Sequence, residues 1–84
     1  PAVKEVYEFI LSILAETSKN ISGIHDVRLF KKDRKKNLAF DISLTRTLKE
    51  EEENRLKGDL TQKLRSRFED LDRVYIQIEP LFSY

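Results

Sequence analysis

The chain has 84 residues, 37% of them charged and 39% hydrophobic, and 16 Lys and Arg nearly cancel 15 Asp and Glu to leave a formal net charge of +1. This length and composition support one small globular domain over residues 1–84, and they exclude a disordered chain. The charge balance argues against a protein that binds polyanions over its whole surface, and the absence of cysteine excludes disulfides, thiolate metal sites and thiol nucleophiles. No apolar run approaches the about 20 residues that a membrane-spanning helix needs.

The first element predicted is an amphipathic helix. Apolar residues recur at three- and four-residue steps over residues 3–19, which places them on one helical stripe. Residues 20–23 then predict a break in which Asn20 or Gly23 takes a left-handed conformation.

Two strands follow. Residues 24–31 and 38–45 alternate between apolar and polar side chains, and the second of these alternations is unbroken. The polar residues 31–37 between them predict a hairpin joined by a loop of several residues.

The second half of the chain predicts a helix and a last strand. Thr47 and Glu50 have the spacing of a capping box, and leucines spaced by multiples of four extend the helix to about Glu69. Residues 74–79 alternate as a third strand, which Pro80 closes. The predicted order is α-β-β-α-β.

Each predicted strand has one apolar face, and two amphipathic helices are available to cover it. The sequence therefore predicts an α+β fold, a two-layer sandwich in which both helices lie on one face of a three-stranded mixed sheet. The opposite face is either simply wetted by solvent or a docking surface. Its expected side chains are Arg28, Phe30, Ala39, Asp41, Ser43, Thr45, Tyr75, Gln77 and Glu79.

No pattern in the sequence indicates catalysis. His25, next to Asp26, is the sole histidine, and it is either a base, a metal ligand or, more commonly, a hydrogen-bonded surface residue. A chain with two glycines cannot build a phosphate-binding loop or a nucleophile elbow. We therefore expect that the protein is not an enzyme.

The predicted hairpin tip is strongly basic. A solvated loop is the favoured interpretation, and the alternative is a patch that contacts the phosphates of nucleic acid or of anionic membrane lipid. Phe30 and Tyr75 weakly imitate the base-stacking aromatics of RNA-binding sheets, but acidic residues elsewhere on the surface disfavour nucleic acid. The basic residues of the tip are Lys31, Lys32, Arg34, Lys35 and Lys36.

Residues 21–29 (ISGIHDVRL) resemble a family signature, V-x-G-V/I-H-D-L/V-R. This signature opens the first strand of the C-terminal cytosolic domain of cation diffusion facilitator transporters, which are zinc and divalent-metal/proton antiporters. Residues 47–48, before an acidic helix, resemble the family's helix start, and residues 74–80 resemble its closing V-x-I-H-h-D/E-P motif. The resemblance covers nearly the whole chain.

The resemblance implies a metallochaperone-like, ferredoxin-like fold. It also implies a regulatory and dimerisation domain that forms a homodimer at the cytoplasmic side of the cell membrane, attached to a transmembrane domain that carries the transport site. The alternatives are a free-standing metallochaperone-like or adaptor protein of the same fold and, third, a nucleic-acid-binding module that uses the basic hairpin.

Family ligands carry over in part. His25 matches the signature histidine that binds metal, and Glu79 stands at the acidic position of the closing motif, whereas Ser43, Asn54 and Gln77 occupy positions where family members have histidine. Zinc sites normally have four ligands, so the resemblance implies that zinc or another divalent metal binds weakly or no longer binds, and that folding needs none. The expected dimer interface contains Phe30, Ser43, Tyr75 and Gln77.

Overall fold

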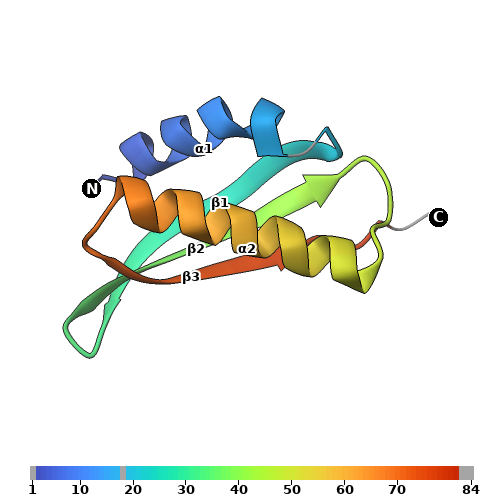
Figure 1. The fold of residues 1–84 in the computed structure, drawn as a ribbon. Coiled ribbons are helices and arrows are strands. Elements are labelled where there is room, and N and C mark those ends of the chain that lie inside the picture. The colour runs from blue at the N-terminus through green and yellow to red at the C-terminus, as the bar shows by residue number, and fades with distance from the viewer. Residues whose placement is uncertain (1, 18, 82–84) are drawn as a thin grey trace.

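The computed structural model describes residues 2–17 and 19–81. Its elements are α1 (Val3–Thr17), β1 (Ile21–Lys32), β2 (Lys35–Leu44), α2 (Glu50–Arg67) and β3 (Leu71–Ile78). β2 is the central strand, antiparallel to β1 and parallel to β3, which makes the sheet mixed. Both helices lie on one side of the sheet, and none of the described residues forms a helix on the other side (Figure 1). The predicted two-layer α+β sandwich is confirmed.

The core lies between the helices and the sheet. α1 contributes apolar residues at the helical spacing to this core, α2 contributes three leucines spaced by four, and β2 contributes alternate residues. Phe9 of α1 and Phe68, just after α2, add an edge-to-face contact with ring centroids 5.6 Å apart. The side chains with no measurable exposure are Val6, Ile10, Leu38, Phe40, Ile42, Leu60 and Leu64.

β1 is longer than predicted and contains a bulge. Ile24 pairs with Ile42 and Leu29 with Leu38, and all four lie in the core layer. In a regular strand, residues five apart point to opposite faces, so Ile24 and Leu29 could not both reach the core. The register shift between His25 and Arg28 inserts one residue, which restores the alternation.

Two predictions about the backbone at turns are wrong. Neither glycine has a positive φ, and among the described non-glycine residues positive φ occurs only at Asp26, Asp33 and Arg34. The chain therefore passes from α1 to β1 without the left-handed residue expected at Asn20 or Gly23. The hairpin has no long loop either: β1 and β2 are joined by Asp33 and Arg34 alone, whose φ values of 54° and 67° are typical of a type I′ turn.

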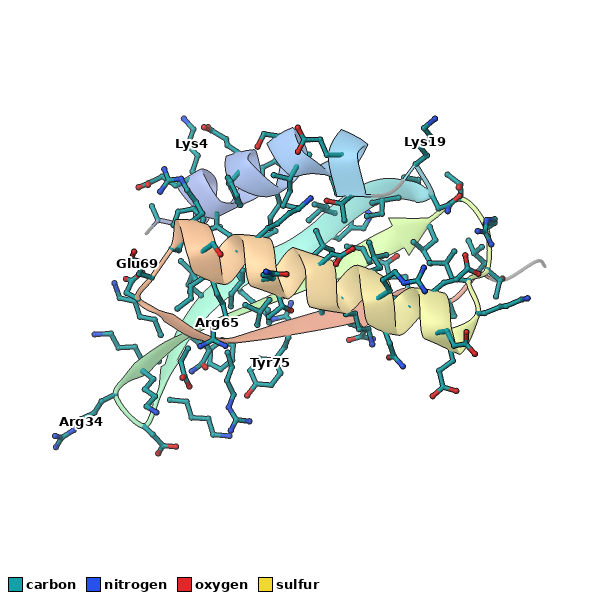
Figure 2. All side chains as sticks on the ribbon, in the orientation of Figure 1. Lys4, Lys19, Arg34, Arg65, Glu69 and Tyr75 are labelled. Atoms are coloured by element: carbon teal, nitrogen blue, oxygen red, sulfur yellow. The ribbon has the colours of Figure 1, made fainter. Side chains whose placement is uncertain are left out.

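The N-terminal end of α1 and the tip of the β1–β2 hairpin lie close to the same end of the molecule. α1 and β1 are joined by a short link and run in opposite directions, so the start of α1 and the β1–β2 turn lie at the same end (Figure 1). Lys4 and Arg34 lie at this end, and Lys19 lies at the opposite end (Figure 2).

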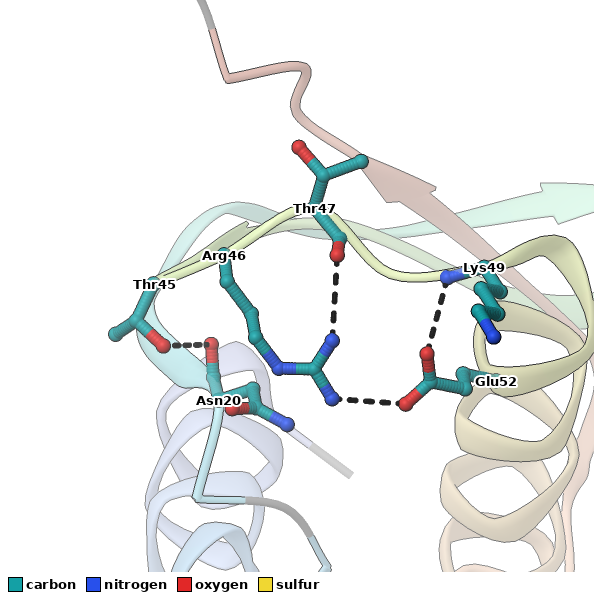
Figure 3. A network of polar contacts seen from close by, with 6 residues as sticks. All are labelled: Asn20, Thr45, Arg46, Thr47, Lys49 and Glu52. Carbon is teal, nitrogen blue, oxygen red and sulfur yellow. Dashed lines mark hydrogen bonds and ion pairs between the residues drawn. The ribbon is translucent and has the colours of Figure 1, made fainter.

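α2 begins at Glu50, three residues after Thr47, so the predicted Thr47–Glu50 capping box is wrong. The backbone N–H of Lys49 donates to Glu52 Oε1 at 3.1 Å, and Arg46 Nη2 donates to Glu52 Oε2 at 2.8 Å (Figure 3). Glu52 thus supplies the returning half of a capping box. The Arg46 guanidinium and, next, the Lys49 N–H lower the pKa of the Glu52 carboxyl.

Asn37 fixes the register between β2 and β3. Its side chain is 2% exposed; Nδ2 donates to the Lys35 carbonyl at 3.1 Å and Oδ1 accepts from the Arg73 N–H at 3.2 Å. These bonds lie where the β2–β3 pairing shifts by one residue, so the amide connects backbone groups of the two strands at this irregularity. The sequence pattern places Asn37 in the polar turn, whereas the structure places it in β2 with this bridging role.

Candidate functional site

The sheet surface opposite the helices is called the open face below. Register and alternation place four rows of side chains on it, each row running across β1, β2 and the β3 side. From the hairpin end, the rows are Phe30–Asn37–Arg73, Arg28–Ala39–Tyr75, His25–Asp41–Gln77 and Gly23–Ser43–Glu79. Every residue expected on this face is there except Thr45, which lies beyond the end of β2.

Three of the predicted site residues meet at one end of the open face. His25 Nε2 lies 2.8 Å from Ser43 Oγ, and Ser43 Oγ donates to Glu79 Oε2 at 3.1 Å. The backbone N–H of Glu79 donates to the Ile42 carbonyl, which fixes Glu79 beside β2 although β3 ends one residue earlier. The hydrogen-bonded chain therefore links the three strands at this end of the sheet.

The direction of these hydrogen bonds determines which nitrogen of His25 carries a proton. The Ser43 hydroxyl has one hydrogen, and it donates that hydrogen to Glu79. The contact with His25 must then be donated by the ring Nε2–H. In neutral His25, Nδ1 is left as the nitrogen with a lone pair available to a ligand.

Two neighbours of His25 account for its position. A Cβ at Gly23 would lie 3.2 Å from His25 Nε2, so any larger residue at this position would require the ring to shift by a few tenths of an ångström. Asp26 takes the left-handed conformation, with φ 54°, at the bulge directly after His25. Asp and Asn tolerate this conformation better than other side chains with a Cβ. Neither role was predicted, although the odd spacing of Ile24 and Leu29 is the signal that would have found the bulge.

The donors of one chain do not form a closed zinc site. Ser43 stands between His25 and Glu79, and no group of three or more His, Cys, Asp or Glu suited to a metal occurs among the residues described. A tetrahedral zinc needs four ligands, and one imidazole with one carboxylate supplies half of them. Asn54 lies apart from His25 and Glu79, exposed on α2 in the other layer.

Asp41 lies between His25 and Gln77 in the third row of the open face. Its Oδ1 is buried and has no hydrogen-bond partner within the described part of the chain. A buried carboxylate oxygen without a partner is costly, so this row accommodates an additional donor.

Phe30 and Tyr75 form the apolar part of the open face. Their rings stack at 26° with centroids 6.0 Å apart, although one lies on β1 and the other on β3. Ala39 of the intervening strand is small, which leaves room for the rings to meet over β2, and it is only 6% exposed. Phe30 and Tyr75 themselves remain 39% and 41% exposed.

The basic residues predicted at the hairpin tip divide into two groups. On β2, Lys36 pairs with Asp70 at 2.9 Å and lowers the pKa of that carboxyl, and Lys35 lies 3.9 Å from Asp72. The remaining three, Lys31, Lys32 and Arg34, are exposed and have no acidic partner in residues 2–17 and 19–81.

These features define a class of protein: a small metallochaperone-like α+β domain with one bare sheet face that carries a histidine and a carboxylate. The family model described as "Cation efflux protein, cytoplasmic domain" matches residues 2–81. Because the match spans nearly the whole chain, the chain belongs to this family.

Solved structures of the same kind share the fold. The metal-bound C-terminal domain of the CzcD transporter from Thermotoga maritima is 24% identical, with a TM-score of 0.74 over 95% of this chain and 92% of that one. CzrB in its zinc form is 22% identical, with a TM-score of 0.77 over 93% and 83%. The cytosolic domain of a cation diffusion facilitator family protein is 22% identical, with a TM-score of 0.73 over 93% and 92%. No curated protein sequence matches the chain.

The resemblance to cation diffusion facilitator cytosolic domains is thus confirmed. Within the described ranges, no helix is long and apolar enough to cross a membrane.

Proposed function

We propose that the 84 residues form a single regulatory and dimerisation domain of a divalent-metal/proton antiporter, with zinc as the favoured ion. The family match over residues 2–81 and the fold shared with transporter cytosolic domains support this proposal. In it, a membrane-embedded part precedes the domain, as expected for a match to C-terminal domains, and it contains the transport site. The domain itself performs no enzymatic step.

The observation that carries the proposal is the exposed Phe30–Tyr75 stack on a sheet face that no helix covers. Exposed aromatic pairs flanked by polar groups are typical of protein interfaces. A second copy of the chain is the occupant that the family supports, since a twofold axis brings the same face to itself. In this proposal Phe30 and Tyr75 form the apolar centre, and Ser43 and Gln77 belong to the polar rim.

In our proposal, metal binding is weak and is not needed for folding or for dimerisation. The site would contain His25 and Glu79, completed by the same pair from a second copy or by water. The hydrogen bonds of Ser43 support this proposal, because they already link the three strands without a metal.

Sedimentation equilibrium at tens of micromolar, without metal, tests the dimer. We expect the wild-type chain to dimerise and Tyr75→Ala to weaken dimerisation at least about tenfold, as loss of a central aromatic does at other interfaces. Tyr7→Ala is the matched control, because Tyr7 is 39% exposed but lies on α1 in the other layer.

A wild-type chain that stays monomeric both with and without added zinc would contradict the proposal. Equal weakening by Tyr75→Ala and Tyr7→Ala would show that the open face is not the interface.

A further inference from the structure

The β1–β2 hairpin extends beyond the rest of the sheet as a two-stranded arm. β3 begins opposite Lys36, which pairs with Lys31, so the arm is two-stranded over residues 32–35. The arm closes in a two-residue turn with positive φ at both positions, which makes it a defined ribbon. Below, "the basic arm" denotes residues 31–36.

Lysines face one another across the basic arm. Lys31 pairs in register with Lys36, and Lys32 with Lys35. Like charges directly opposite each other destabilise a two-stranded ribbon, so these rungs oppose the folding of the arm. The two rungs also point to opposite faces of the ribbon, which makes both faces basic.

Acidic residues compensate only one strand of the basic arm. Asp70 and Asp72 pair with Lys36 and Lys35. At the tip, Asp33 is the single acid beside Lys31, Lys32 and Arg34. The outermost part of the arm therefore has an excess of positive charge.

The basic arm lies at a specific end of the molecule. It is at the end where α1 begins, with Arg34 and Lys4 at this end and Lys19 at the other (Figures 1 and 2). If a membrane-embedded part precedes α1, this is the end nearest the bilayer. This step depends on the proposed function.

We propose that the basic arm contacts the anionic headgroups of the membrane in which the transporter lies, and so orients the domain relative to the bilayer. A headgroup surface fits the arm better than a single bound anion does, because two carboxylates line the hollow of about 200 Å³ beside the arm. The hollow is lined by Asp33 and Asp72 together with the cations Lys32, Lys35 and Arg73. A diffuse anionic surface needs only the excess charge at the tip, and it is attracted within about a Debye length, roughly 10 Å at 0.1 M salt.

Vesicle co-sedimentation of the 84-residue chain tests the inference. The probes are vesicles of phosphatidylcholine alone and vesicles that also contain phosphatidylglycerol, each at low and at physiological salt. We expect binding only to the anionic vesicles, with a loss as salt rises. Each basic residue near such a surface contributes about fivefold to partitioning, so the double variant Lys31→Glu/Lys32→Glu should bind at least about 30-fold less.

This double variant should fold at least as well as the wild type. The new glutamates lie opposite Lys36 and Lys35, so opposite charges replace the two like-charge rungs. Its thermal unfolding is measured alongside, and loss of vesicle binding with an unchanged or higher Tm assigns the effect to the contact with lipid.

Lys19→Glu/Lys49→Glu is the control with the same change in net charge. Both lysines are exposed and lie away from the arm, Lys19 at the far end and Lys49 before α2. This control should retain wild-type binding to the anionic vesicles.

Three outcomes would overturn the inference. The first is that the chain binds anionic vesicles no better than phosphatidylcholine vesicles. The second is that the two double variants lose vesicle binding equally. The third is that the chain is retained on a single-stranded RNA at salt concentrations that abolish vesicle binding. Retention on RNA would favour nucleic acid as the partner. No preference for anionic vesicles would indicate that the lysines only prevent association at the edge of the sheet. None of these outcomes bears on dimerisation, which sedimentation tests separately.

Discussion

Residues 23–26 show how a short sequence can fix the position of one side chain. Gly23 leaves space for the imidazole, His25 donates to Ser43, and Asp26 takes the left-handed conformation that the bulge requires. Each of these residue types meets a steric, hydrogen-bonding or backbone requirement of the structure around the His25 ring. Exchange of any one of them therefore affects the position of His25.

Asp26 offers a direct test at this scale. Asp26→Val places a β-branched residue at φ 54° and should lower the free energy of unfolding by about 1–2 kcal/mol. Asp26→Gly should be close to neutral, because glycine adopts this φ without strain. Urea unfolding of both variants measures the difference, and equal stability of the two would contradict a strained bulge.

At the scale of elements, the start of α2 depends on Glu52 rather than on the threonine that the sequence favoured. Arg46 and the Lys49 N–H both donate to the Glu52 carboxylate, and Thr45 donates to the Asn20 carbonyl in the same region (Figure 3). These contacts determine how the chain leaves β2 and enters the helix. They also define the position of the helix relative to the link between α1 and β1.

The lowered pKa of Glu52 predicts a pH dependence. A carboxyl whose pKa is lower in the folded chain contributes stability that is complete above the unfolded pKa, about 4.3, and is lost as the pH falls through the folded pKa. Glu52→Gln should therefore lower Tm by a few degrees at pH 7, and the difference from wild type should shrink below about pH 4.

Glu51→Gln is the matched control for this experiment. It removes the same charge from the same helical turn, but the Glu51 side chain is exposed and makes no hydrogen bond or ion pair with the described residues. If Glu51→Gln lowered Tm as much as Glu52→Gln, loss of helix-dipole stabilisation and not the cap would explain the effect.

At the scale of the whole molecule, both helices lie on one side of the sheet, and the described residues leave the open face uncovered. That arrangement places His25 and Glu79 at the face on which we propose that a second copy docks. A metal site shared by two copies would gain the ligands that one chain lacks. In our proposal, dimerisation therefore precedes metal binding.

Zinc calorimetry tests this sharing. We expect weak binding by the wild-type chain and an affinity at least about tenfold lower for His25→Ala, since loss of a ligand should cost at least as much as loss of a residue that orients one. Tyr75→Ala should weaken zinc binding as well, because it separates the two copies without removing a ligand. Equal heats from wild type and His25→Ala would remove His25 from the site.

The order of elements, the two layers and most of the open face were predictable from the sequence. His25 was not expected on that face, because only the bulge in β1 brings it to the same side as Arg28 and Phe30. Helical and strand periodicities are local. The alternation of apolar and polar residues over a run such as 38–44 is therefore enough to predict which side chains face the core. The family signature around His25 was equally visible, because it is contiguous. The two-residue turn was not predicted. Residues 31–37 are mostly charged, which is typical of a loop, although all of them except Asp33 and Arg34 belong to strands.

The tertiary structure alone decided how the residues of the candidate site contact one another. Ser43 lies 18 residues from His25 and 36 from Glu79, and the hydrogen bonds between them exist only because strand pairing sets these residues in adjacent positions. The Phe30–Tyr75 stack depends in the same way on a strand that lies between them in space. Pairing register is a property of two segments at once, and a bulge in one of them changes it, so neither segment's own sequence can specify the contact.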